Sequence, residues 1–212
     1  MYIHDFTDGT PREILDMKVT KAQAQANRTH IVETASALFR ERGYDGVGIA
    51  ELMAVAGFTH GGFYKHFASK ADLLAEAAIC GFTQSAAMAE GVDAGEVVKQ
   101  YLSRAHRDAR GEGCTMAALC GDAARQPASI KAAFATGVES LLASLTNQLG
   151  APEDVKQEGE RAARIEVIAQ VIGAMVLSRA CPDDSPLADE ILDVCRAAAL
   201  SRLSTRLDAP RH

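Results

Sequence analysis

Seven residues between positions 59 and 66 have side chains or backbones suited to contacting a nucleic acid. They are Thr59, His60, Gly61, Gly62, Tyr64, Lys65 and His66. Tyrosine and histidine donate hydrogen bonds to phosphate oxygens, histidine can also contact a base edge, and lysine adds a positive charge. The chemistry predicted for this stretch is therefore contact with the phosphates and base edges of duplex DNA.

The two glycines of this stretch need a separate explanation. On a helix with about 100° per residue, Phe63 and Phe67 fall together and are expected in the core, while Lys65 lies opposite them between Gly61 and Gly62. A glycine in a helix costs roughly 0.5–1 kcal/mol relative to alanine, so stability alone does not favour the pair. A helix without Cβ atoms on its outer face can approach DNA closely. The alternative interpretation is that the segment is a loop.

Three residues around the stretch have more than one interpretation. Thr59 stands where a helix N-cap is expected, and its hydroxyl can cap the helix, contact DNA or do both. Lys70 begins the next helix, where its ammonium and the free backbone N–H groups suit a phosphate. Arg28, near the start of the first helix, is a further DNA-contact candidate, and a solvated surface position explains it equally well.

A set of short helices is expected to position these side chains. Helices are predicted over residues 22–42, 49–56, 60–66 and 70–90. The two short helices, joined by a tight turn at Gly57, have the layout of a helix-turn-helix, whose second helix lies in the major groove of DNA. Gly43 is expected to end the first helix, and the Ser69 hydroxyl, with Asp72 three residues later, to cap the fourth.

The charge is uneven along the 212 residues, whose formal net charge is -6. Residues 18–70 carry seven Lys and Arg against four Asp and Glu, whereas the segments on either side are both acidic. A basic segment on an acidic body indicates that this part meets a polyanion, although so small an excess can also arise by chance.

Composition and motifs exclude several classes of protein. Hydrophobic residues make up 48% and charged residues 24%, as in ordinary globular proteins. No long apolar run and no signal peptide are present, so we expect a cytoplasmic chain without membrane contact. The five cysteines form no C-x-x-C pair, and the common nucleophile, zinc-protease and phosphate-loop motifs are missing. We therefore expect neither an enzyme nor a bound metal or other cofactor.

The fold class expected is all-α with about nine helices. The chain contains 39 alanines, the residue with the highest helix propensity, and shows no sustained alternation typical of strands. Beyond the first four, helices are predicted over residues 94–107, 115–125, 128–149, 153–180 and 185–207. We expect a flexible tail at 1–21, within which Met17 is a possible native start, a helix-turn-helix domain at 22–69 and a body at 70–212.

Four motifs resemble the DNA-binding domain of TetR-type transcriptional regulators. They are Gly43-Tyr44, Ile49-Ala50-Glu51-Leu52-Met53, residues 56–67 and Ser69-Lys70-Ala71-Asp72-Leu73. The resemblance covers about residues 22–75. It implies a homodimer with a three-helix DNA-binding domain and a helical body that binds a small inducer. It also implies that Tyr64, His66 and Lys70 contact DNA and that residues 59–62 contact bases. Val47 and Gly48 depart from the Thr or Ser common in the family, as does the acidic tail.

The last two predicted helices are apolar around most of their circumference, which indicates burial on more than one side. We expect them to pack against their own chain and against a second copy, as the resemblance also implies. The residues chosen for this interface are Ile168, Ile172, Met175, Ile191, Leu192 and Cys195. A well-buried monomer core is the alternative. A two-fold dimer would bind a palindromic operator with half-sites about 34–36 Å apart or a multiple of that distance.

The middle helices are expected to hold the inducer. Candidate lining residues, each of which also fits an ordinary core, are Phe82, Met88, Tyr101, Met116, Leu119, Cys120, Phe134 and Val138. The function expected is a repressor that is released from double-stranded operator DNA by a small molecule. Two alternatives remain: a repressor that senses oxidants or electrophiles through Cys114 or Cys120, and a helical small-molecule carrier whose N-terminal domain no longer functions.

Overall fold

The computed structural model describes residues 20–149 and 157–207, and every regular element in these ranges is helical. In chain order the elements are α1 (Lys21–Arg42), α2 (Ile49–Val55), the 3-10 helix η1 (His60–Lys65), α3 (Lys70–Ala89), α4 (Ala94–Tyr101), α5 (Arg104–Asp108), the 3-10 helix η2 (Arg110–Glu112), α6 (Thr115–Ala123), α7 (Ala128–Leu149), α8 (Gln157–Ala180) and α9 (Pro186–Leu207). The all-α prediction is thereby confirmed.

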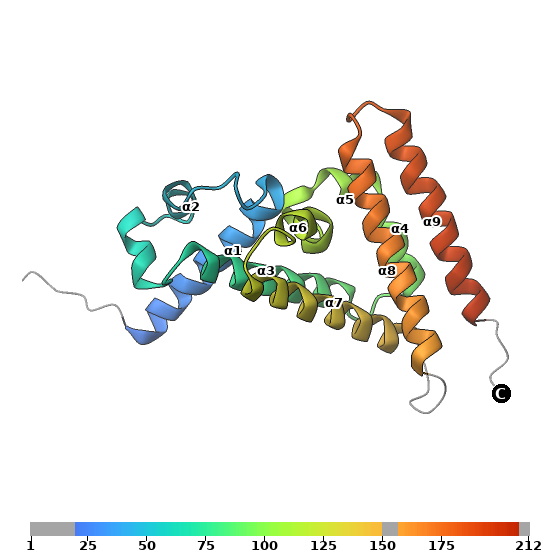
Figure 1. Cartoon of the computed structure of the whole chain (residues 1–212), viewed down its shortest axis with the longest axis horizontal. Helices are drawn as coiled ribbons and strands as arrows, with labels where there is room; N and C mark the ends of the chain where they lie inside the picture. Colours follow the sequence, from blue (N-terminus) through green and yellow to red (C-terminus); the bar gives the residue numbers. More distant parts are fainter. Residues whose placement is uncertain (1–19, 150–156, 208–212) are drawn as a thin grey trace, which may run out of the picture.

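The molecule is elongated, with the DNA-binding candidates at one end and the last two helices at the other (Figure 1). The end that contains α1, α2 and η1 is called the head here, and the remainder, from α4 onward, is called the body. Helix α3 runs between them, packing on α1 in the head and on α7 in the body. One hydrophobic core extends through both parts.

Helix α1 begins and ends where local sequence signals place its boundaries. The Thr20 hydroxyl accepts the Gln23 N–H at its start, so Thr20 and Lys21 belong to this helix and not to a flexible tail. Gly43 ends the helix with φ of 77°, a conformation that favours glycine, and its N–H donates to Phe39 O. Residues 1–19, which include Met17 and the rest of the predicted tail, lie outside the described residues.

Helix α3 approaches its neighbours closely at Gly81. A Cβ at this position would lie 2.2 Å from Thr115 Oγ1 and 2.6 Å from Arg40 Nη1. The position therefore has no room for a side chain where α1, α3 and α6 meet. At the start of α3, the Ser69 hydroxyl accepts the Asp72 N–H, as the predicted capping box requires.

The single helix predicted over residues 94–107 is wrong. The structure has two helices, because Leu102 leaves the helical conformation with ψ of 46° and the Ser103 hydroxyl caps a new helix by accepting the His106 N–H. The buried side chain of Arg107 then fixes α5 to the end of α8, donating to the carbonyl oxygens of Ser178 and Cys181.

Helices α8 and α9 form a hairpin, and they contact each other along their length (Figure 1). Met175 and Leu192 are fully buried in it, at 0% and 2% exposure. The Ser178 hydroxyl donates to Ala188 O across the hairpin. None of the helices in the described ranges is long and apolar enough to cross a membrane.

Candidate nucleic-acid interface

The predicted outer helix is a 3-10 helix, not the α-helix expected from the sequence. Gly62 N–H donates to Thr59 O and His66 N–H donates to Phe63 O, which is the i to i+3 pattern of this helix type. Two glycines lower the propensity for an α-helix, and short segments readily adopt the tighter form. The segment is thus helical and not an irregular loop. Phe63 is fully buried beside Phe67, with ring centroids 5.4 Å apart, so the expected inner face is confirmed.

The outer face of η1 points away from the protein. Thr59, His60, Gly61, Tyr64 and Lys65 are exposed, with Tyr64 at 65%. His66 and Gly62 are half-buried. The stretch thus presents a phenol, an ammonium, an imidazole and a hydroxyl to solvent, all within two helical turns.

The space around the two glycines does not explain their presence. A Cβ at Gly61 would meet nothing within 4 Å, and one at Gly62 would make only ordinary contacts, 3.6 Å from Thr59 Oγ1 and 3.7 Å from Met53 Cε. Neither residue has a positive φ. Internal packing therefore does not require glycine at either position.

Thr59 occupies the N-cap position of η1, but its hydroxyl makes no capping hydrogen bond. The expected capping role of the side chain is therefore not found, and the residue is exposed next to His60. The preceding turn depends on Gly57, which has φ of 81°. This glycine is needed for the turn conformation, unlike the two in η1.

Lys70 is bonded to the loop that precedes α2. Its Nζ donates to Tyr44 O and to Val47 O, both at 2.7 Å, and lies 5.9 Å from the centroid of the Phe39 ring. These two bonds leave one of its three protons for another acceptor. Lys70 therefore holds the 43–48 loop in place, a role that sequence reasoning missed.

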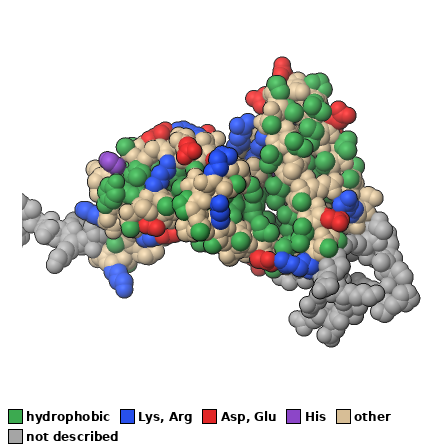
Figure 2. Space-filling model, viewed as in Figure 1, with side chains coloured by type: hydrophobic (Ala, Val, Ile, Leu, Met, Phe, Trp, Pro, Cys, Tyr) green, Lys and Arg blue, Asp and Glu red, His purple; other side chains and the backbone are tan. Residues whose placement is uncertain are grey.

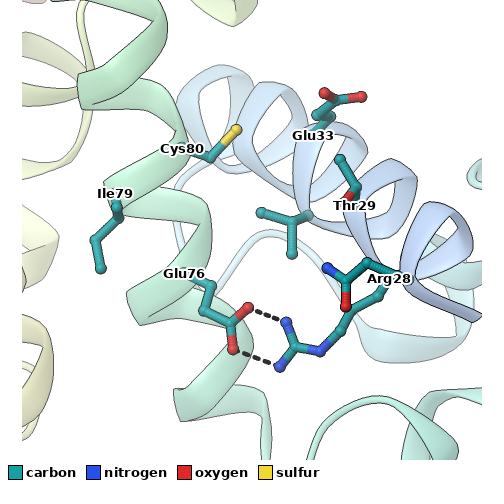
Figure 3. A pocket seen from close by; sticks show the side chains of 8 residues that line it. Arg28, Thr29, Glu33, Glu76, Ile79 and Cys80 are labelled. Atoms are coloured by element: carbon teal, nitrogen blue, oxygen red, sulfur yellow. Dashed lines mark hydrogen bonds and ion pairs between the residues drawn. The ribbon is translucent and has the colours of Figure 1, made fainter. Parts of the chain in front are cut away.

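Arg28 is bonded within the protein. Its guanidinium pairs with both carboxylate oxygens of Glu76 on α3 (Figure 3). It also lies over the Phe67 ring, 4.5 Å from the ring centroid. The hydrogen bond to Glu76 is the main cause that raises the pKa of Arg28 above its usual value. The pair borders an open groove of about 280 Å³ between α1 and α3, in which Ile79 and Cys80 also lie. In this structure Arg28 thus ties α1 to α3, and its contact with DNA stays a prediction.

The eight residues expected at an inducer site are distributed over α3, α4, α6 and α7, and their role stays a prediction. Phe82 and Phe134 pack edge to face, with centroids 5.3 Å apart. Val138 is half-buried against the core, whereas Met88 is 75% exposed. The remaining four lie on α4 and α6, namely Tyr101, Met116, Leu119 and Cys120.

A second cavity, of about 760 Å³, lies beside the end of α3 and α7. It is lined by Thr83, Ala86, Ala87, Ala89, Glu90, Gly91, Val92, Asp93 and Ser144. This set shares no residue with the eight chosen from the sequence.

The outward face of the α8–α9 hairpin carries several large apolar side chains, together with charged residues such as Glu166, Asp193 and Arg202. Figure 2 shows hydrophobic side chains over this end of the molecule. Large exposed members of the face are Ile165, Val176, Leu177, Leu187 and Val194. Leu177 and Val194 are 60% and 62% exposed, whereas the predicted interface residues Met175 and Leu192 are buried inside the chain. Ile168, Ile172, Ile191 and Cys195 are half-buried. The set predicted from the sequence thus lies toward the inner face of these two helices, and their part in a dimer stays a prediction.

Among the described residues, no group of three or more His, Cys, Asp or Glu side chains is placed to hold a metal ion. Cys114 is buried and precedes the first residue of α6. Cys120 is an exposed residue overall, but its thiol is partly buried, with Sγ 3.3 Å from Met116 Sδ. This partial burial raises the pKa of the Cys120 thiol. Burial also raises the pKa of Cys80. A raised pKa lowers the thiolate fraction, so these two thiols lack the usual activation of a reactive cysteine.

Comparison with known protein families gives a sequence match over most of the head and the first part of α3. Residues 31–77 match the family of bacterial regulatory proteins described as the tetR family. Over 57 residues the chain is 40% identical to the HTH-type transcriptional regulator AcrR of Shigella flexneri, which covers 27% of this chain and 26% of AcrR. The aligned part therefore spans about a quarter of that relative.

Solved structures extend the likeness to the body. The reduced form of Escherichia coli NemR is similar with a TM-score of 0.65 and 17% identity, over 82% of this chain and 95% of NemR. A TetR-family transcriptional regulator from Agrobacterium tumefaciens gives a TM-score of 0.64 and 22% identity, over 84% of this chain and 98% of that one. At these identities the likeness establishes a shared fold over the matched part of the chain.

Proposed function

We propose that this chain, whose residues 31–77 match the tetR family of bacterial regulatory proteins, represses transcription by binding a palindromic operator as a dimer. A small-molecule inducer would release the protein from this operator. The outer face of η1 would contact DNA, with Tyr64, His66 and Lys65 on phosphates and residues 59–62 near base edges.

The observation that carries this proposal is the open space at Gly61. Nothing within 4 Å would meet a Cβ there, so the glycine serves no packing purpose inside the chain. A bare backbone on the outer face of the second helix allows that helix to approach the floor of a major groove. The exposed Tyr64 and Lys65 on the same helix then supply phosphate contacts.

The apolar face of α8 and α9 supports a dimer. Contiguous exposed apolar surface on a folded chain marks an interaction site, and a second copy of the same face would bury Leu177 and Val194. Two heads related by a two-fold axis would then contact two half-sites about 34–36 Å apart or a multiple of that distance. An inducer would release the protein only to the extent that it prefers a body conformation in which this spacing differs.

The test is fluorescence anisotropy with duplex DNA from immediately upstream of the gene for this protein, titrated at several salt concentrations against a scrambled duplex. We expect sequence-selective binding with a steep negative dependence on salt. If the upstream DNA is not selected, an operator is sought by selection from random duplexes. Failure of both steps, with equal weak binding to all sequences, would overturn the proposal and favour the carrier alternative.

A further inference from the structure

We infer that Asp122, at the end of α6, couples the body to the head by holding the backbone of Tyr44. This inference rests on the proposed function and adds a contact through which the state of the body reaches the DNA-binding helices. The carboxylate is on α6, whereas Tyr44 begins the loop that leads from α1 to α2. Asp122 would thus be a positioning residue and not a DNA contact.

The peptide groups of Tyr44 are held from two sides. The Tyr44 N–H donates to Asp122 Oδ2 at 3.0 Å, and the Tyr44 carbonyl accepts from Lys70 Nζ at 2.7 Å. Lys70 also holds Val47 O at 2.7 Å. The same loop is therefore fixed by a carboxylate of the body and by the first residue of α3.

The side chain of Tyr44 prevents this loop from moving independently. The residue is 1% exposed, and its ring packs edge to face on Phe39 with centroids 5.5 Å apart. A displacement of Asp122 must therefore either break the bond to Tyr44 N–H or move the end of α1 with it. Because Gly48, at the end of the loop, is the N-cap of α2, such movement would reorient the helix-turn-helix.

Gly43 makes the approach of Asp122 possible. A Cβ at Gly43 would lie 2.8 Å from Asp122 Oδ2, closer than real Cβ atoms come. The same glycine has φ of 77°. Both the backbone conformation at the end of α1 and the approach of Asp122 therefore favour a residue without a Cβ. The other carboxylate oxygen, Oδ1, accepts from Arg125 Nη2 at 2.8 Å at the surface, which leaves Oδ2 for the head.

Helix α6 is placed to respond to events in the body. Met116 and Leu119 are 1% and 2% exposed, and α6 packs against α3, α7 and α8. A ligand that rearranges these helices would shift α6 and, with it, the Asp122 carboxylate. The relation is reciprocal, because coupling between two sites acts equally in both directions. DNA bound at the head must therefore change the stability of α6.

That reciprocity provides a test that needs no inducer. Amide hydrogen exchange is measured on the full chain with and without the duplex selected in the anisotropy experiment. In the wild-type protein we expect DNA to slow exchange in η1 and also in residues 115–126, the latter by about 5-fold or more. In Asp122→Ala we expect the slowing in η1 to persist at saturating DNA and the slowing in 115–126 to be lost.

Arg125→Ala is the matched control, because it removes the surface ion pair and leaves Asp122 on Tyr44. It should keep the response of α6. If Asp122→Ala does not fold by circular dichroism, Asp122→Leu replaces it, since leucine is similar in shape and has no oxygen to accept the Tyr44 N–H. Slowing confined to η1 in the wild-type protein, or an α6 response unchanged in the Asp122 variant, would overturn the inference alone. A wild-type chain that binds no duplex would overturn the proposed function and the inference with it.

Discussion

The outer face of η1 and the outer face of the α8–α9 hairpin both expose side chains that the fold does not use. The first presents a phenol, an ammonium and a bare glycine backbone, and the second presents large aliphatic groups such as Leu177 and Val194. Polar donors can remain in water until a phosphate replaces it, whereas exposed aliphatic surface gains free energy as soon as it is covered. The two faces therefore differ in the partner they suit, DNA for the first and a second copy for the second.

The largest effect is expected on the aliphatic face. Leu177→Glu would place a charge in the proposed dimer interface and prevent association. The selected operator should then bind about 100-fold or more weakly, because two linked heads gain affinity that one head lacks. Analytical ultracentrifugation and anisotropy measure the two effects. Ile79→Glu is the control, since Ile79 is also an exposed aliphatic residue, at 51%, but lies on α3. If Leu177→Glu still forms a dimer and binds the operator with normal affinity, the aliphatic face is not the dimer interface.

A smaller but more selective effect is expected at Gly61. Gly61→Val adds atoms where the chain itself leaves open space, so the melting temperature should change little. Binding of the selected operator should fall about 10- to 100-fold, from loss of one or two base contacts, while binding to scrambled DNA persists. Gly61→Ala should give a weaker loss. Gly121→Ala, at another glycine with open space around its Cβ, should leave DNA binding unchanged. Normal operator binding by Gly61→Val would disprove the close approach of the η1 backbone to the major groove.

Lys70→Ala is expected to weaken binding to every sequence alike. The salt dependence should fall by about one unit of slope per protomer if the remaining proton of Nζ meets a phosphate. The variant should also lose roughly 1 kcal/mol of stability, because the bonds to Tyr44 O and Val47 O are lost. Salt titration and urea unfolding measure these separately. If the variant loses stability but the salt dependence of DNA binding is unchanged, Lys70 supports the 43–48 loop and does not contact DNA.

The smallest effect is expected at Arg28, whose side chain is 30% exposed beside Glu76 at 36%. A double-mutant cycle of Arg28→Ala and Glu76→Ala should give a coupling of about 0.5 kcal/mol in unfolding experiments, as for other partly exposed ion pairs. The salt dependence of DNA binding should not change. A slope that falls by one in Arg28→Ala would show instead that the guanidinium leaves Glu76 for a phosphate.

The head could be predicted from sequence more completely than the body because its signals are local. Gly43 and Ser69 mark helix ends through their own backbone conformation or a neighbour three residues away. Phe63 and Phe67 were assigned to the core from spacing alone. The 3-10 form of η1 was missed because the sequence shows only that glycine weakens an α-helix, not which helix replaces it.

The missed features of the body arise from contacts between residues far apart in the chain. Arg107 is 1% exposed because it bonds to carbonyl oxygens more than 70 residues away, and an arginine in a sequence gives no sign of such burial. Asp122 reaches Tyr44 across 78 positions. The break at Ser103 was the exception, because a capping serine is a local signal that could have been recognised.

Helix α3 has a consequence for exchanging parts between related regulators. Its first half, with Leu73 and Ala77, is buried against α1, and its second half, with Phe82, packs on Phe134 of α7. A chimaera joined at residue 69 would pair an α1 with an α3 that never evolved together. A junction at 90–93, after α3 ends, would transplant the head with its own supporting helix. The new surface between α3 and α7, including the tight fit of Gly137 against the Phe82 ring, would then be the one to redesign.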